Sequence, residues 1–173
     1  QENAKGVAAM DLKEFWHTGR KLPKGHALNA IMAPTPSVPE VEDFDSATND
    51  LFQAFDTLGQ SLLECVATGL ELPVDYFTQR VKYGNSILRL LHYPAQKNPP
   101  PEGSVRAAAH EDINVITLLL GADEAGLQVK PRGVDEWIPV NAPEGSLVIN
   151  VGDMLQRLTN KVLQSTTHQV VNP

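Results

Sequence analysis

Short strand-like segments separated by turn residues occupy the second half of this chain, and they constrain its fold more than any other feature. From residue 86 onward the apolar segments are short and are divided by turns that contain glycine or proline. Their ranges are 87–93, 105–109, 113–120, 127–130, 136–140, 146–151 and 163–171. Many short strands at regular spacing are typical of an antiparallel sandwich or barrel and do not fit a parallel βαβ fold.

The first half of the chain follows a helical pattern instead. Residues 20–43 contain four prolines with little periodicity, which indicates an extended connector. A long amphipathic helix is expected after it, with Asp45 or Ser46 as its N-cap and with Gly69 and Pro73 at its end. Its apolar face comprises Leu51, Phe55, Leu58, Leu62 and Val66, at steps of three or four. A helix followed by a series of strands predicts a helix packed on a jelly roll.

The length of 173 residues predicts a single domain over residues 1–173. We expect an N-terminal connector and packing helix in residues 1–85 and the core of the jelly roll in residues 86–173. The chain starts at Gln1 and stops within a strand-like segment, so we expect the jelly roll to be incomplete at both ends, with its last strand or strands missing.

Charge and cysteine content narrow the possible functions. The 14 basic and 21 acidic side chains give a net charge of −7, which repels nucleic acids and anionic membrane surfaces. The apolar segments are too short to cross a bilayer, and a single cysteine forms no internal disulfide. We therefore expect a cytoplasmic enzyme or binding domain without nucleic-acid or membrane partners. The sequence makes no prediction of the oligomeric state.

Two histidines and one aspartate form a candidate metal site. His110 and Asp112 are two residues apart in an extended segment, so both side chains point to the same face. His168 lies in the last strand, which a closed jelly roll can bring beside this pair. Two imidazoles and one carboxylate on one face of an octahedron leave three positions open, an arrangement that suits Fe(II) oxygen chemistry. The residues alone also allow a surface pair without a metal, or zinc, which often takes cysteine ligands that are missing here.

The residues around these side chains resemble a known enzyme family. The segment 106–120, Arg-Ala-Ala-Ala-His-Glu-Asp-Ile-Asn-Val-Ile-Thr-Leu-Leu-Leu, is similar to the iron-binding segment of the isopenicillin N synthase-like Fe(II)/2-oxoglutarate-dependent oxygenases. Further segments that resemble the family follow in the family's order, at 126–129, 137–140, 145–153, 158–160 and 165–168. Upstream, residues 11–15 resemble the segment after the family's N-terminal portion, so the resemblance covers most of the chain.

This resemblance implies a double-stranded β-helix, with His110, Asp112 and His168 as the ligands of Fe(II). It implies an oxygenase that couples O₂ activation and the decarboxylation of 2-oxoglutarate to the oxidation of a small organic substrate. Tyr93 matches a family tyrosine that hydrogen-bonds a carboxylate in the pocket, and Leu119 and Leu127 match apolar positions that line it. No catalytic residue beyond the metal ligands is implied.

Other functions stay open on the sequence. The Arg-x-Ser pair that binds the distal carboxylate of 2-oxoglutarate in the family belongs to a strand beyond Pro173, so the use of this co-substrate is undecided. A 2-oxoglutarate-independent oxidase like isopenicillin N synthase, which takes all four electrons from its substrate, fits His110, Asp112 and Tyr93 equally well. A jelly roll that has lost catalysis and serves as a binding module is the third possibility. The substrate and the outcome (hydroxylation, desaturation or cyclisation) are not predicted.

Overall fold

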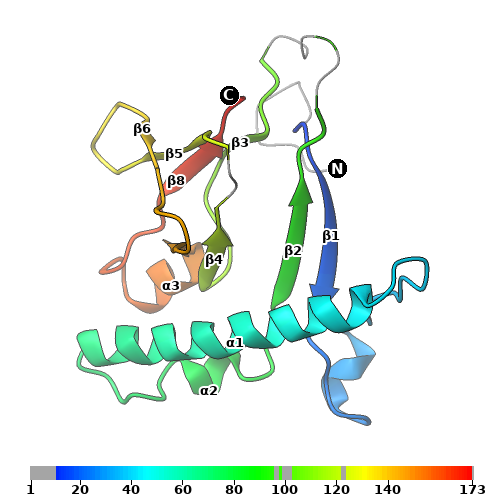
Figure 1. Ribbon diagram of the computed structural model, residues 1–173. Coiled ribbons are helices and arrows are strands. Elements are labelled where there is room, and N and C mark those ends of the chain that lie inside the picture. Colours follow the sequence, from blue (N-terminus) through cyan, green and yellow to red (C-terminus); the bar gives the residue numbers. More distant parts are fainter. Residues whose placement is uncertain (1–10, 96–97, 99–102, 122–123, 173) are drawn as a thin grey trace. The chain divides into compact units, whose positions relative to one another are not determined.

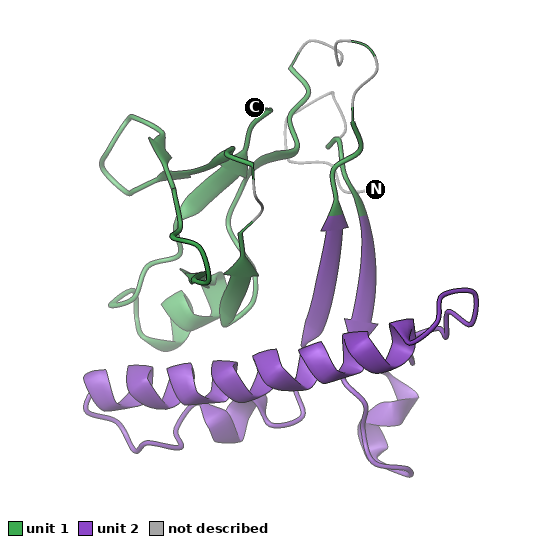
Figure 2. Ribbon diagram, viewed as in Figure 1, with its two compact units in different colours: residues 1–14, 92–173 green, residues 15–91 purple. Residues whose placement is uncertain are grey.

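The computed structural model describes residues 11–95, 98, 103–121 and 124–172, so part of the predicted N-terminal connector lies outside the described residues. Two compact units are present: unit 1 contains the described residues up to Glu14 and from His92 onward, and unit 2 contains Phe15–Leu91 (Figure 2). The elements in chain order are β1 (Glu14–Gly19), η1 (Ala27–Ala30), α1 (Phe44–Gly69), α2 (Thr78–Val81), β2 (Ile87–His92), β3 (Ala107–His110), β4 (Ile116–Leu120), β5 (Leu127–Lys130), β6 (Ile138–Pro139), β7 (Leu147–Val151), α3 (Asp153–Leu158) and β8 (Thr167–Val170) (Figure 1).

Unit 2 is built around the long helix α1 and the two-stranded sheet β1–β2 (Figure 1). The predicted helix is confirmed, and it ends at Gly69 as expected. Its buried positions differ from the predicted face: Leu51 and Leu58 are exposed, whereas the buried side chains are Thr48, Phe52, Leu63 and Ala67. The buried line therefore lies one residue further around the helix than apolar periodicity alone indicated.

The start of α1 also differs from the prediction. The helix begins at Phe44, and Asp43, with φ 57°, precedes it without a side-chain cap, so the predicted caps Asp45 and Ser46 lie inside the first turn. The Asp45 carboxylate is engaged elsewhere, because it accepts hydrogen bonds from the Ser37 hydroxyl at 2.5 Å and the Val38 amide at 3.1 Å. These two donors, the hydroxyl first, hold the pKa of Asp45 below its ordinary value.

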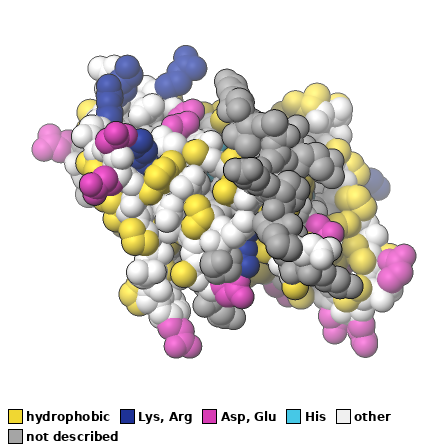
Figure 3. Space-filling view, turned by 90° about the horizontal axis from the view of Figure 1, so that it is seen from above, with side chains coloured by type: hydrophobic (Ala, Val, Ile, Leu, Met, Phe, Trp, Pro, Cys, Tyr) yellow, Lys and Arg dark blue, Asp and Glu magenta, His cyan; other side chains and the backbone are white. Residues whose placement is uncertain are grey.

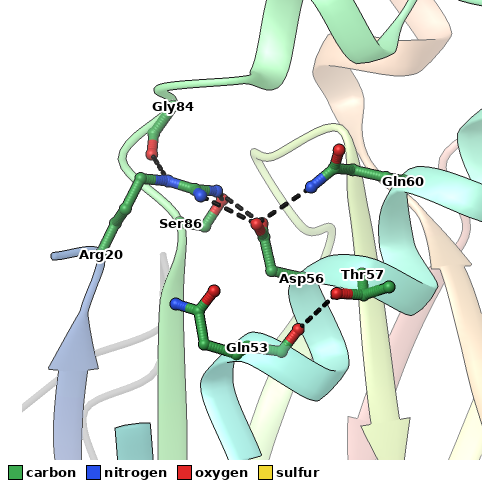
Figure 4. Close-up of polar contacts among 7 residues, drawn as sticks. All are labelled: Arg20, Gln53, Asp56, Thr57, Gln60, Gly84 and Ser86. Carbon is green, nitrogen blue, oxygen red and sulfur yellow. Dashed lines mark hydrogen bonds and ion pairs between the residues drawn. The ribbon is translucent and has the colours of Figure 1, made fainter. Parts of the chain in front are cut away.

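Arg20 joins three segments of unit 2 (Figure 4). Its guanidinium makes a two-pronged contact with the Asp56 carboxylate of α1, at 2.8 and 2.5 Å, and its Nε donates to the Gly84 carbonyl oxygen at 2.9 Å. Gln60 donates to the same carboxylate at 3.1 Å. The Arg20 and Asp56 side chains are only 10% and 17% exposed, so this pair is screened less than a surface ion pair.

Replacing Arg20 with methionine should lower the free energy of unfolding by about 2 kcal/mol, because a partly buried carboxylate then loses its charged partner. Urea titration followed by circular dichroism measures this. The double variant Arg20→Met/Asp56→Leu should recover to within about 1 kcal/mol of the wild type, since no unpaired charge remains. The exposed Arg132 supplies the control, and Arg132→Met should change stability by less than about 0.5 kcal/mol. Equal urea midpoints for Arg20→Met and the wild type would contradict this role.

Unit 1 contains two antiparallel sheets, of strand order β3-β8-β5-β6 and β4-β7. Strand β8 pairs with β3 on one side and with β5 on the other, although β8 is far from both in the sequence. Buried side chains in this unit include Ala107 and Ala108 of β3, His168 of β8 and Leu155 of α3. The predicted class, a mainly β jelly roll with flanking helices, is confirmed.

None of the helices within the described residues combines the length and the apolar character that a membrane-spanning helix requires.

Strand limits differ from the prediction mainly at β4, β6 and β8, which are shorter than expected. Strand β4 starts at Ile116 rather than at residue 113, because the preceding backbone forms other hydrogen bonds that are described below. Four elements were not predicted: β1, the short helices η1 and α2, and the six-residue helix α3. Each of these helices is too short to show helical periodicity, and η1 lies within the predicted extended connector 20–43. The prediction of one domain over residues 1–173 stays a prediction.

Candidate metal centre

The pairing of β3 with β8 brings two histidines together. His110 and His168 are directly opposite in the antiparallel register, so their side chains lie on the same face of the sheet. Their ring centroids are 4.4 Å apart. Asp112 follows two residues after β3, and one donor atom from each of the three side chains lies within 4.8 Å of the others. The structure thus brings together the three residues that the sequence singled out.

Backbone carbonyls determine which nitrogen of each ring faces the cluster. Nδ1 of His110 donates to the Ala108 carbonyl oxygen at 2.7 Å, and Nδ1 of His168 donates to the Thr166 carbonyl oxygen at 3.1 Å. A carbonyl oxygen can only accept, so each Nδ1 carries a proton and each neutral ring presents the lone pair of Nε2. Carbonyl contacts of this kind orient metal-binding histidines and make the second nitrogen a better ligand.

The two oxygens of Asp112 face different groups. Oδ1 lies 3.9 Å from Nε2 of His110 and 3.8 Å from Nε2 of His168, which is too far for hydrogen bonds. Oδ2 accepts a hydrogen bond of 2.6 Å from the hydroxyl of Thr117. The carboxylate therefore directs one oxygen to the imidazoles and the other to β4.

The donor set fits a divalent cation. With neutral rings, Oδ1 and the two Nε2 atoms are all acceptors, so they cannot satisfy one another, whereas a cation between them would satisfy all three. Two ligand atoms with bonds of about 2.1 Å to one ion are at most about 4.2 Å apart, and both measured separations are below this limit. Two nitrogens and one carboxylate oxygen suit Fe(II). The His110 side chain is 42% exposed, compared with 8% for His168, so small molecules can approach from the side of His110.

A backbone clamp fixes the segment that carries Asp112. The amides of Gly152, Asp153 and Met154 donate to the carbonyl oxygens of Val115, Asp112 and Asn114 at 3.0, 2.7 and 3.1 Å. These carbonyls are thereby withdrawn from a strand ladder, which explains the late start of β4. A Cβ atom at position 152 would overlap the backbone of Asn114, so this close approach requires glycine.

The structure places Tyr93 beside a cation. The guanidinium of Arg106 lies over the Tyr93 ring, 5.2 Å from its centroid, and pairs with the Glu124 carboxylate at 2.5 Å. All three belong to unit 1. The predicted contact of Tyr93 with a ligand carboxylate stays a prediction.

The two predicted pocket leucines share strand faces with residues of the cluster. Leu119 lies two residues after Thr117 on β4 and therefore points to the same side of the strand. Leu127 lies two residues before Val129, the partner of His168 in the register, and so shares the face of that histidine. Leu127 also lines an open pocket of about 180 Å³, together with Gln128, Pro139 and Asn141. Their role in a substrate pocket stays a prediction.

Three residues that build the site were not singled out from the sequence: Asn114, Thr117 and Gly152. All three lie inside segments that resemble the family, which was the available signal. Their contacts with Asp112 or its backbone join segments that are far apart in the chain, and no local pattern reports such contacts.

Comparison with known proteins gives a consistent result. The profile of the 2OG-Fe(II) oxygenase superfamily matches residues 84–173. A 2-oxoglutarate-dependent dioxygenase, frbA, of Dothideomycetidae sp. (strain 11243) is 38% identical over 96% of this chain and 49% of its own length. The 2-oxoglutarate-Fe(II) type oxidoreductase hxnY of Emericella nidulans is 30% identical over 95% of this chain and 49% of its own length. The chain thus spans about half the length of the curated relatives it matches.

Solved structures have the same fold. A Caulobacter crescentus protein whose crystal structure was assigned to the 2OG-Fe(II) oxygenase family superposes with a TM-score of 0.86 at 53% identity, over 100% of this chain and 55% of that chain. A full-length Neurospora crassa protein, crystallised with α-ketoglutarate (2-oxoglutarate), superposes with a TM-score of 0.83 at 37% identity, over 96% of this chain and 50% of that chain. Since the family profile covers just over half of the chain, this protein belongs to the 2OG-Fe(II) oxygenase superfamily.

Proposed function

We propose that this protein is a non-haem Fe(II)-dependent oxygenase that consumes O₂ and 2-oxoglutarate and oxidises a small organic substrate. In this proposal His110, Asp112 and His168 are the metal ligands. The observation that carries it is the convergence of three acceptor atoms, from two strands and a clamped segment, within 4.8 Å of one another.

Each side chain contributes a defined property. Each imidazole can supply the lone pair of Nε2, because Nδ1 of the same ring donates to the carbonyl oxygen of Ala108 or Thr166. Asp112 supplies one negative charge, which offsets half of the charge of a divalent ion. Three donors on one face leave the opposite face for the co-substrate and O₂, and bound Fe(II) supplies the redox chemistry that O₂ activation requires.

The names of the relatives support 2-oxoglutarate as co-substrate. Two of them are named as 2-oxoglutarate enzymes, and the Neurospora crassa protein was crystallised with this compound. This favours a 2-oxoglutarate-dependent reaction over an oxidase that takes all four electrons from its substrate. The complete donor set favours an enzyme over a jelly roll that serves only for binding.

We infer a small substrate from the same comparisons. One relative is named as a proline hydroxylase, and the Neurospora crassa protein was also crystallised with thymine. Both acidic and basic side chains appear on the face shown in Figure 3, among hydrophobic and uncharged groups. The net charge of −7 disfavours nucleic acid as a partner. The exposed, unpaired thiol of Cys65 fits a reducing compartment, so we place the protein in the cytoplasm.

Fe(II) affinity tests the assignment of the ligands. His110→Ala and His168→Ala should each weaken binding at least tenfold, because two donors hold the ion much less well than three. Anaerobic titration measures the affinity, and succinate release in air measures co-substrate turnover, which should disappear in both variants. His92→Ala is the matched control, since this exposed histidine pairs with Glu14 and lies outside the cluster. Unchanged Fe(II) affinity in both ligand variants would overturn the assignment, and bound iron without succinate release would overturn the use of 2-oxoglutarate.

Tyr93 tests the predicted carboxylate contact. Tyr93→Phe keeps the ring that contacts Arg106 and removes only the hydroxyl. If that hydroxyl donates to the co-substrate, the KM for 2-oxoglutarate should rise roughly fivefold to tenfold, which corresponds to the loss of one hydrogen bond to a charged group. Steady-state assays at saturating Fe(II) measure this. If the KM for the organic substrate rises instead, Tyr93 contacts that molecule, and unchanged values of both constants would contradict either role.

A further inference from the structure

We propose that Thr117 is a positioning residue that restricts Asp112 to one oxygen as a metal ligand. This inference rests on the proposed function and adds the feature that keeps three coordination positions open. A carboxylate can bind a metal ion through one oxygen or through both. Binding through both would occupy a fourth position, and a co-substrate that chelates through two atoms would then leave no room for O₂.

The contact between Thr117 and Asp112 is short and directed. The Thr117 hydroxyl lies 2.6 Å from Oδ2 of Asp112, in the range of hydrogen bonds from a hydroxyl to a charged oxygen. Oδ1 of the same carboxylate is the atom that faces both imidazoles. The hydroxyl therefore engages the oxygen that does not face the cluster.

Asn114 determines the direction in which the Thr117 hydroxyl points. The Asn114 side-chain amide donates to the Thr117 oxygen at 2.8 Å. A hydroxyl has a single proton, and with the amide proton directed at its oxygen, its own proton is available for Asp112. The three side chains form a chain of hydrogen bonds from Asn114 to Thr117 to Asp112.

The backbone clamp holds this chain of hydrogen bonds in place. The Asn114 carbonyl oxygen accepts from the Met154 amide at 3.1 Å, and the missing side chain of Gly152 leaves room for Asn114. Thr117 itself lies in β4, where its register partner is Asn150 of β7. Both supporting residues are thus fixed by backbone hydrogen bonds, so the Asp112 carboxylate cannot rotate without breaking its contact with Thr117.

Thr117→Val tests this inference because valine has nearly the same shape and lacks the hydroxyl. Mn(II) is a suitable probe, since it accepts the same ligands as Fe(II) and relaxes the protons of water molecules bound to it. With one carboxylate oxygen bound, Mn(II) keeps three waters, and with both bound it keeps two, so water relaxation should fall by about one third in Thr117→Val. The affinity of the Mn(II)-loaded protein for 2-oxoglutarate should fall roughly tenfold, while the Mn(II) affinity itself is kept or increased.

Three further variants separate this role from a merely structural one. Thr117→Ser keeps the hydroxyl and should restore the wild-type values. Asn114→Ala removes the amide that donates to the Thr117 hydroxyl oxygen, so water relaxation by the Mn(II)-loaded variant should lie between the values for the wild type and Thr117→Val. This variant also tests the inference if Thr117→Val fails to fold. Thr57→Val is the matched control, because the Thr57 hydroxyl donates to the Gln53 carbonyl oxygen of its own helix and lies outside the cluster of His110, Asp112 and His168.

The outcomes are distinct for the two proposals. Equal water relaxation and equal 2-oxoglutarate affinity in the wild type, Thr117→Val and Asn114→Ala would overturn the role of Thr117 alone. If Thr117→Val lowered both the Mn(II) affinity and the thermal stability without losing a bound water, Thr117 would have only a structural role, and the proposed positioning role would also be overturned. If the wild-type protein bound no Mn(II) or Fe(II), the proposed function would fall together with this inference. Normal Mn(II) behaviour without succinate release would overturn only the proposed co-substrate.

Discussion

The pairing of β3 with β8 is the interaction on which the candidate site depends. It is an antiparallel pairing between segments that are far apart in the sequence, and a β-bulge or irregularity between Ala107 and His110 shifts its register so that His110 lies opposite His168. Because side chains alternate along a strand, a shift of one residue in this register would turn one imidazole to the other face and remove it from the cluster. Strand β8 also pairs with β5, so the register is fixed on both of its edges. The position of one candidate ligand thus follows from backbone hydrogen bonds, in which none of its possible metal-binding atoms takes part.

The third candidate ligand, Asp112, is positioned in a different way, since it lies beyond the end of β3. Its backbone is held by amides that precede and begin α3, and the residues concerned are Gly152, Asp153 and Met154. Strand β4 is shorter as a consequence, because the backbone carbonyls before it bind these amides and do not pair in the sheet. The same hydrogen bonds hold the backbone of Asp112 in place. Leu155 of α3 is fully buried, so packing of this short helix holds the clamp in place. The core of unit 1 and the candidate site are therefore not independent in stability.

The sequence pointed to the three candidate ligands because their chemistry and their order are local properties. The spacing of His110 and Asp112 placed both side chains on one face, and the order of the surrounding segments identified His168. The start of α1 could not be predicted, because the Asp45 carboxylate is engaged by Ser37 and Val38, and propensity does not report such a contact. Gly152 was equally hidden: its φ of −95° is allowed for any residue, and only the approach of Asn114 makes a side chain impossible there. What the sequence missed are specific side-chain and backbone contacts, some between neighbouring segments and some between distant ones, that no periodicity or propensity reports.

One rule connects the three candidate ligands. Each has two atoms that could bind a metal ion, and in each the protein engages one atom and leaves the other facing the cluster. Backbone carbonyls engage the two imidazoles, at Ala108 and Thr166, whereas a side chain, Thr117, engages the carboxylate. Substitution of a residue cannot remove a backbone carbonyl, so the tautomers of the two rings are insensitive to mutation at those positions. The orientation of the carboxylate is different, because its contact is made by the Thr117 side chain, which a single substitution can remove.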